Sequence, residues 1–362
     1  MYNLTYPQAI FCAIYWIFFT VMYSFSLKKN IRYTFGKGFF FFWLIITIYS
    51  TFEFSGGDFY NYKEIYNQIL YYNSSIHLES FYIWVLKLLP HNYFLWRFVV
   101  WGLASFFWIQ IAKELKLDIR LYALLFFLII FFLFVGARQS LGFSILYLGL
   151  IILLKSDNNT YTRMVGLMIM GIACFFHKTM FIYLIVSLIS IVNFRKRTIV
   201  GFLILFPVFH NGIDLLIDPI NQLVSDDIAI NAIQRYLNSD FRSEANLYGI
   251  IRKVIDRCPV FLLIIYSIKN IFFDNERVDY IQEVLLRISF ILIYVSYLFV
   301  GKDVSAFISP RFWDAALFPL TIFLSQYLFN HSPQKNGLVK ISLVLFVLSK
   351  LFTIMYRVYK IN

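Results

Sequence analysis

Apolar runs of about 15–20 residues recur along the whole chain, separated by mostly short polar breaks. A helix of that length crosses or nearly crosses a bilayer, and it satisfies its own backbone hydrogen bonds there. We therefore predict about twelve transmembrane helices. Their expected spans are 8–26, 38–53, 93–111, 121–136, 139–154, 163–176, 179–193, 198–210, 258–273, 284–300, 312–330 and 338–356.

The composition agrees with a membrane protein. Charged residues make up 14% of the chain, against about 25% in a soluble domain. The first span, 8–26, lacks a basic segment before it and a small-residue cleavage site, so we interpret it as a retained helix. The expected fold is an all-α integral membrane protein in which residues 1–362 form a single polytopic domain.

The formal net charge of +12 does not indicate nucleic-acid binding, because the basic residues concentrate in short breaks between spans. The positive-inside rule makes alternate breaks cytoplasmic and places both termini outside. The basic residues assigned to the cytoplasmic breaks are Lys28, Lys29, Arg32, Lys37, Lys113, Lys116, Arg120, Lys155, Arg163, Arg195, Lys196, Arg197, Lys269, Arg277, Arg287, Lys335 and Lys340.

Two of the external breaks are long, at about 54–92 and 211–257. In the first, apolar residues recur at helical spacing and predict an amphipathic helix in the membrane interface. These residues are Phe59, Tyr62, Tyr66, Ile69 and Leu70. The second loop is rich in both acidic and basic residues and is expected to form a lid. Arg235 and Tyr236 of this loop are predicted substrate contacts.

Two arginines stand at predicted external helix starts. Arg138 follows Val135-Gly136-Ala137 at the beginning of a span, and Arg311 follows Ser309-Pro310, a typical helix-start pair. Helix N-termini attract anions, and arginine can bind a phosphate through two hydrogen bonds. We interpret the pair as a metal-free pyrophosphate cradle. The alternative for Arg138 is an interfacial side chain that reaches for water, and Arg311 can instead pair with Asp314.

His177 and Asp58 are the other candidate catalytic residues on the same external side. His177 ends a span and is either a general base, a hydrogen-bond donor to substrate, or a helix cap. Asp58 is either a general base or the N-cap of the amphipathic helix. Nearby residues are predicted to contact substrate: Tyr62, Glu79, Arg97, Lys178 and Asp314.

No metal or cofactor is expected. Cys174 and His177 form a C-x-x-H pair, but a zinc site needs about four ligands and the sequence offers no second pair.

Several segments, taken in order, resemble the EpsG-like family of polysaccharide polymerases, which is related in role to Wzy-type O-antigen polymerases. They are Gly57-Asp58-Phe59-Tyr60-Asn61-Tyr62, Glu79-x-Phe81, Arg138 with its following helix, Phe176-His177-Lys178-Thr179 and Arg311-Phe312. The chain departs from the family pattern just before Gly57. Where such polymerases often have an arginine, it reads Ser50-Thr51-Phe52-Glu53-Phe54-Ser55.

The resemblance implies a membrane glycosyltransferase with a bundle similar to GT-C enzymes. It implies polymerisation of oligosaccharide repeat units, for O-antigen or exopolysaccharide, at the outer face of a bacterial cytoplasmic (inner) membrane. Donor and acceptor would both be linked to undecaprenyl pyrophosphate, and a chain-length regulator and a flippase would be partners. It also implies that Asp58 or His177 is the base, without deciding between them.

Two other functions fit the same composition. A flippase for lipid-linked oligosaccharides would also need about a dozen helices, but it should carry charges within its spans and show inverted repeats. A polyprenyl-dependent ligase would use the same donor and make one transfer instead of a polymer.

Overall fold

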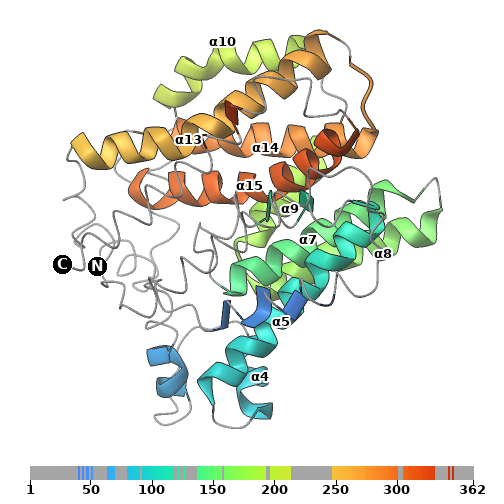
Figure 1. Cartoon of the computed structure of the whole chain (residues 1–362), viewed down its shortest axis with the longest axis vertical. Helices are drawn as coiled ribbons and strands as arrows, with labels where there is room; N and C mark the ends of the chain where they lie inside the picture. Colours follow the sequence, from blue (N-terminus) through green and yellow to red (C-terminus); the bar gives the residue numbers. More distant parts are fainter. Residues whose placement is uncertain are drawn as a thin grey trace. The chain divides into compact units, whose positions relative to one another are not determined.

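The computed structural model describes residues 40, 43–44, 46–48, 50–51, 63–69, 80–89, 92–117, 121–122, 125–126, 137–156, 159–192, 196–212, 247–274, 276–300, 305–330, 341–342 and 345. Within these residues every regular element is helical, as predicted. Figure 1 shows the helices in chain order.

The helices follow the predicted apolar spans closely in the middle of the chain. The bounds there are α5 Tyr93–Glu114, α7 Ala137–Leu154, α8 Thr160–Phe176, α9 Met180–Ile191 and α10 Lys196–Gly212. Three later helices begin earlier than predicted: α13 Leu247–Ile268, which continues into the π-helical turn η4 Lys269–Phe273, then α14 Tyr280–Leu298 and α15 Ser305–Asn330. The expected loop 211–257 was therefore too long, because α13 occupies its last residues.

The expected loop 54–92 also contains helix. Residues 63–69 are helical, in line with the predicted amphipathic helix, and α4 spans Ser80–Leu88. Tyr66 is buried, and its ring centroid lies 5.4 Å from that of Tyr93. This segment therefore packs on the start of α5.

Polar side chains define several helix starts. Asn92 accepts hydrogen bonds from the backbone N–H groups of Phe94 and Leu95, at 2.9 and 3.2 Å, and thereby caps α5. Asn159 caps α8 by accepting from the N–H of Thr162. These side chains satisfy N–H groups that have no partner within their own helix.

Two of the described helices, α5 and α14, are long and apolar enough to cross a membrane by length and composition. Large apolar side chains are exposed on other helices, for example Met168 (64%), Phe175 (74%) and Ile204 (70%). Exposure of this kind is costly in water and typical of helices that face lipid. The total of about twelve spans and the GT-C-like arrangement stay predictions.

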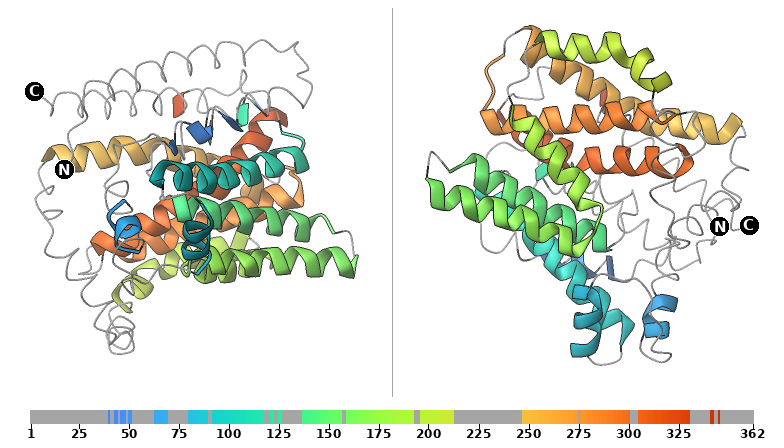
Figure 2. Two further views of the ribbon diagram at one scale, coloured as in Figure 1. Left: turned by 90° about the horizontal axis from the view of Figure 1, so that it is seen from below. Right: turned by 180° about the vertical axis from the view of Figure 1, so that it is seen from behind.

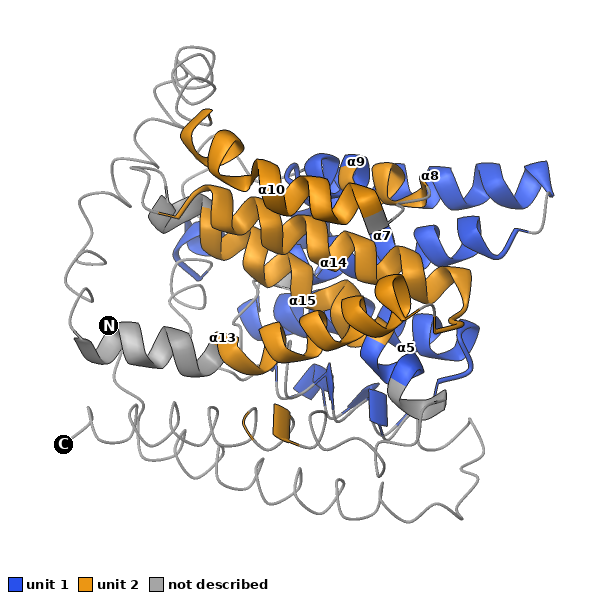
Figure 3. Ribbon diagram, turned by 90° about the horizontal axis from the view of Figure 1, so that it is seen from above, with its two compact units in different colours: residues 1–185, 324–331, 350–362 blue, residues 186–323, 332–349 orange. Residues whose placement is uncertain are grey.

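The chain divides into two compact units (Figure 3). Unit 1 comprises residues 1–185, 324–331 and 350–362, and unit 2 comprises residues 186–323 and 332–349. Helices α9 and α15 contribute residues to both units. The single domain predicted from the sequence stays a prediction.

In unit 1, α7 and α8 pack with their backbones in close approach (Figure 1). Gly149 faces Gly166, and a Cβ added to Gly166 would lie 2.8 Å from the backbone nitrogen of Leu153 and 2.9 Å from the carbonyl oxygen of Gly149. Closer to the start of α7, Gly142 faces Met180. Small residues at such contacts are typical of helix packing in membranes.

Substituting Gly166→Ala is therefore expected to destabilise unit 1 by about 1–3 kcal/mol, because a rigid backbone must move to accept the methyl group. Gly171→Ala on the same helix is the matched control, since nothing lies within 4 Å of its added Cβ. Thermal unfolding of the purified protein in detergent measures both. Equal melting temperatures for the two variants would contradict the close approach.

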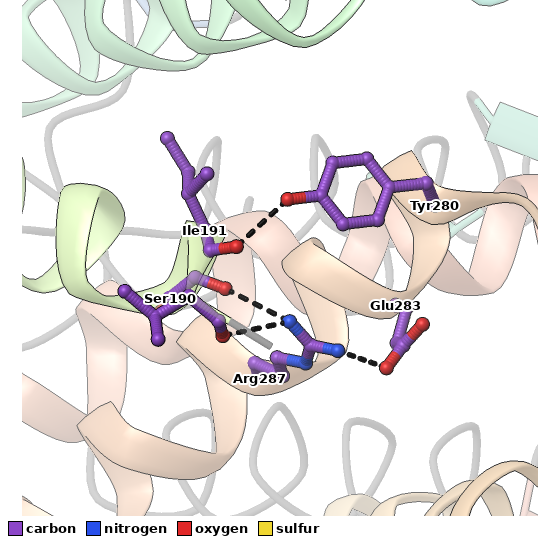
Figure 4. Close-up of polar contacts among 6 residues, drawn as sticks. Ser190, Ile191, Tyr280, Glu283 and Arg287 are labelled. Carbon is purple, nitrogen blue, oxygen red and sulfur yellow. Dashed lines mark hydrogen bonds and ion pairs between the residues drawn. The ribbon is translucent and has the colours of Figure 1, made fainter. Parts of the chain in front are cut away.

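In unit 2, α13 and α10 each pack against α14 (Figure 2). Arg287 of α14 is buried and closes one end of this arrangement (Figure 4). Its Nη1 donates to the carbonyl oxygens of Ser190 and Val192, at 3.3 and 2.9 Å, and its Nη2 forms an ion pair with Glu283. Beside it, the Tyr280 hydroxyl donates to the carbonyl of Ile191 at 2.7 Å. We call this group the Arg287 clamp.

The clamp corrects one assignment from the sequence. Arg287 was counted as a basic residue of a cytoplasmic break, but it is 1% exposed and lies inside α14. It neutralises Glu283 and saturates the carbonyls at the end of α9, which have no partner within that helix. Its charge therefore gives no information about which side of the membrane this end faces.

Contacts between helix ends show how the helices run relative to one another within each unit. The clamp joins the end of α9 to the start of α14, and His210 Nδ1 meets the carbonyl of Leu298 at the opposite ends of α10 and α14, at 2.9 Å. In unit 1, Lys155 Nζ donates to the carbonyl of Glu114 at 2.6 Å and brings the ends of α5 and α7 together. The side of the membrane that each end faces stays a prediction.

Candidate functional site

Arg138 is the second residue of α7, as predicted. The buried Tyr82 of α4 lies against it: the Tyr82 hydroxyl donates to the carbonyl oxygen of Arg138 at 3.3 Å, and the guanidinium carbon lies 5.8 Å from the ring centroid. The first N–H groups of a helix have no partner within it, and the helix dipole adds positive potential there. Arg138 therefore presents its charge at the anion-attracting end of α7.

An aromatic cluster supports this end of α7. Phe81 and Tyr82 of α4 contact Phe176 of α8, with centroid distances of 4.3 and 6.5 Å. Tyr82 also meets Trp96 of α5 edge-on at 6.1 Å, and Trp96 stacks on Tyr93 at 5.9 Å. Rings packed in this way have few alternative rotamers, so the cluster holds α4, α5 and α8 in fixed relation.

His177 follows Phe176 directly and forms the C-cap of α8, in an extended backbone conformation. Its half-buried ring contacts Thr179, two residues further along the chain. The backbone N–H of Thr179 donates to Nδ1 at 3.3 Å, and Thr179 Oγ1 lies 2.9 Å from the same nitrogen. An acceptor role for Nδ1 toward this N–H corresponds to the tautomer with its proton on Nε2.

Arg138 and His177 lie at the same end of the α7–α8 pair. The two helices are antiparallel, since Gly166 of α8 lies against Leu153 and Gly149 while Met170, one turn later, lies against Gly149. The start of α7 and the end of α8 are therefore at the same end of the pair. The aromatic cluster includes Tyr82, which bonds the backbone of Arg138, and Phe176, which directly precedes His177. The sequence predicted both on one external side of a membrane; the structure places them at one end of the α7–α8 pair, and their joint role stays a prediction. Lys178, next to His177, is exposed.

Arg311 belongs to unit 2, and its local structure differs from the prediction. Helix α15 begins at Ser305 and contains Pro310, so Arg311 lies in the second turn and not at the helix start. Pro310 has no N–H, so one backbone hydrogen bond of the helix is missing there. The buried Ser296 hydroxyl donates to the carbonyl of the preceding residue, Ser309, at 2.8 Å and ties this turn to α14. The dipole argument for anion binding, which holds for the first turn, therefore does not apply to Arg311.

The structure shows a further cation beside aromatic rings, which the sequence interpretation did not select. Arg257 of α13 lies over the Trp313 ring of α15, with its guanidinium carbon 4.8 Å from the centroid, and 5.7 Å from the centroid of Tyr297 of α14. It was assigned to the loop 211–257. The helical spacing of Leu247, Ile251, Val254 and Cys258 could have revealed the helix that carries it.

Arg97, a predicted substrate contact, has a clear structural environment. It is 5% exposed, and its guanidinium donates to the carbonyl oxygens of Thr51 and Ser50, at 3.0 and 2.5 Å. Arg97 of α5 therefore contacts Ser50 and Thr51, which come shortly before Gly57 in the sequence. Its role toward substrate stays a prediction.

The remaining predicted site residues fall into two groups. Asp314 is half-buried in α15, one turn after Arg311, and its role also stays a prediction. The others lie outside the described residues: Asp58, Tyr62, Glu79, Arg235 and Tyr236.

The described part of the chain contains no cluster of three or more His, Cys, Asp or Glu residues that could hold a metal ion. Aromatic rings surround both Arg138 and Arg257. The guanidinium groups can bind an anion, and the aromatic faces can pack against a sugar ring.

Comparison with known proteins places the chain in a family. No curated protein sequence and no solved structure matches it significantly. The sequence profile of the EpsG family matches residues 36–361, which is nearly the whole chain, and the protein therefore belongs to the EpsG family.

Proposed function

We propose that this protein is a polysaccharide polymerase that joins oligosaccharide repeat units carried on undecaprenyl pyrophosphate at the outer face of a bacterial inner membrane. The EpsG family is associated with glycosyl transfer in polysaccharide polymerisation. The observation that carries the proposal is that Arg138, at the start of α7, and His177, at the end of α8, lie at the same end of this helix pair. A chain-length regulator and a flippase are the partners that such a reaction requires.

The reaction moves one glycan between two lipids. A hydroxyl of the acceptor sugar attacks the anomeric carbon of the donor glycan, and the bond from that carbon to the pyrophosphate oxygen breaks. The products are the lengthened glycan on the acceptor lipid and free undecaprenyl pyrophosphate, while the hydroxyl proton passes to a base. Negative charge therefore grows on the leaving pyrophosphate, where preorganised donors lower the barrier most.

Arg138 suits the leaving group. Its guanidinium can donate two hydrogen bonds to pyrophosphate, next to N–H groups of the first turn of α7 that point the same way. Tyr82 holds the backbone of Arg138 in place. The predicted participation of Arg311 in the same cradle rests on the sequence, since Arg311 belongs to unit 2.

The contact between Thr179 and Nδ1 of His177 supports one division of the roles that the sequence left open. With Nδ1 accepting from Thr179, Nε2 carries a proton and donates it in a hydrogen bond to a sugar or phosphate oxygen. A nitrogen that already holds a proton does not act as a general base. We therefore assign the base role to Asp58 and the donor role to His177.

This assignment predicts that His177→Gln retains far more activity than His177→Asn. The glutamine amide nitrogen reaches the position of Nε2 and still donates, whereas the asparagine amide reaches only the position of Nδ1. We expect Asn to lower the polymerisation rate by about 10- to 100-fold, in the range of one lost hydrogen bond to a charged group. Equal, complete loss in both variants, with normal yields of protein, would instead support the base role.

The test of the function itself is a reaction with purified protein in proteoliposomes and a defined lipid-linked repeat unit, with and without EDTA. A ladder of products that persists in EDTA supports a metal-independent polymerase. A single added unit would identify a ligase. Movement of the lipid-linked unit across the bilayer without any new glycosidic bond would identify a flippase and overturn the proposal.

A further inference from the structure

An apolar groove runs along unit 2 between α10, α13 and α14. It encloses a volume of about 630 Å³, and its lining residues are all Ile, Leu, Phe or Tyr except Lys269 at one end. Leu203 and Ile265 line it and are 57% and 61% exposed, so the groove opens sideways along its length. From Phe261 to Phe273 it follows α13 and η4 for roughly 18 Å, more than half of the ~30 Å hydrocarbon core.

Arg257 lies beyond the other end of this groove. It is half-buried between the rings of Trp313 and Tyr297, and its Nη1 donates to the Tyr297 hydroxyl at 3.4 Å. Among the described residues no carboxylate pairs with it; the ion pairs found there involve Lys155, Lys269 and Arg287. Guanidinium has five N–H donors, so most of its hydrogen-bonding capacity remains for an anion.

The groove and the cation share two side chains. Phe261 and Tyr297 line the groove, and their rings also pack on each other at 5.2 Å and on Trp313 at 5.5 and 6.1 Å. Phe261 follows Arg257 by one helical turn on α13, so the charge is located at the mouth of an otherwise apolar channel. Arg257 can bind the anionic head of a lipid, and the apolar groove can bind its long hydrocarbon tail.

We infer that this groove binds the polyprenyl chain of the lipid-linked acceptor, with its pyrophosphate on Arg257; the pyrophosphate proposed for Arg138 is that of the donor. The choice of a polyprenyl lipid over an ordinary phospholipid rests on the proposed function. The branched, unsaturated isoprenoid chain fits a lining of Phe, Ile and Tyr, and the aromatic faces around Arg257 keep the guanidinium oriented for a phosphate group.

Binding to the purified full-length protein, measured by native mass spectrometry, tests the inference without requiring catalysis. The probes are undecaprenyl pyrophosphate, the uncharged undecaprenol, and phosphatidylglycerol. Arg257→Gln should weaken undecaprenyl pyrophosphate about tenfold or more and leave undecaprenol unchanged, because only the charged contact is lost. Arg277→Gln, at an exposed arginine of the same unit, should change neither.

Two variants on α10 test whether the polyprenyl chain binds in the groove. Leu203→Trp fills the groove and should weaken the binding of both polyprenyl probes. Ile204→Trp is the control, because it alters the next residue, which is 70% exposed and does not line the groove.

Unchanged affinity in Arg257→Gln, or phosphatidylglycerol binding as tightly as undecaprenyl pyrophosphate, overturns the inference. If Arg257-dependent binding occurs but no polymer forms, the inference stands and the proposed function fails. A polymer ladder without Arg257-dependent binding supports the proposed function and overturns the inference.

Discussion

Arg138→Ala is expected to lower the rate of polymer formation by about 10²–10³-fold with no loss of folded protein. The loss corresponds to the removal of one preorganised donor from a developing oxyanion. The side chain is half-buried at the start of α7, and the Tyr82 hydroxyl bonds its backbone carbonyl, so truncation leaves the helix and that bond in place. Product length and initial rate in the proteoliposome reaction measure the effect.

Two further variants sharpen this result. Arg138→Lys keeps the charge but loses the paired hydrogen bonds, so it should restore only part of the rate. Arg197→Ala is the matched control, because Arg197 is likewise the second residue of its helix, α10, and is exposed. Long chains made by Arg138→Ala at the wild-type rate would remove Arg138 from the mechanism.

Arg287→Met is expected to be the most destabilising substitution among the described residues, at about 3–5 kcal/mol. It leaves Glu283, whose side chain is 25% exposed, without its partner and the carbonyls of Ser190 and Val192 without a donor in a buried site. The cost comes from uncompensated polar groups in an apolar environment more than from the lost attraction itself. Unfolding of the detergent-solubilised protein by SDS titration measures this free energy.

The Arg287 clamp offers two controls. Lys155→Met removes an ion pair with Glu114 whose side chains are 39% and 45% exposed, and should cost at most about 1 kcal/mol. Replacing Glu283 together with Arg287 by methionine should recover part of the loss, because no buried charge remains. If Arg287→Met costs no more than Lys155→Met, the clamp does not hold α9 to α14.

The features predicted correctly depend on local sequence. Helices α5, α7, α8, α9 and α10 coincide with apolar runs bounded by polar residues such as Asn92 and Asn159, whose capping hydrogen bonds reach only two or three residues along the chain. Arg138 and His177 were placed correctly at helix ends for the same reason. The pairing of the two at one end follows from alternating antiparallel spans, which a sequence pattern also reveals.

The features missed depend on contacts that are remote in sequence or that override a local preference. Ser309-Pro310 is a good helix start by composition, yet α15 begins one turn earlier and Ser296 of α14 stabilises the turn that contains the proline. Arg257 became a candidate only through Tyr297 and Trp313, which lie on two other helices. Arg287 looked like a loop cation until its contacts with residues of α9 were known.

The Arg287 clamp also sets a condition on biosynthesis. Arg287 follows Val192 by 95 residues in the chain. At a synthesis rate of roughly 5–20 residues per second, the end of α9 leaves the ribosome about 5–20 s before its partner exists. During that interval its last carbonyls must be satisfied by interfacial water or by the insertion machinery. Unit 2 can therefore close only after α14 has been synthesised, which makes this clamp a late step in the assembly of the protein.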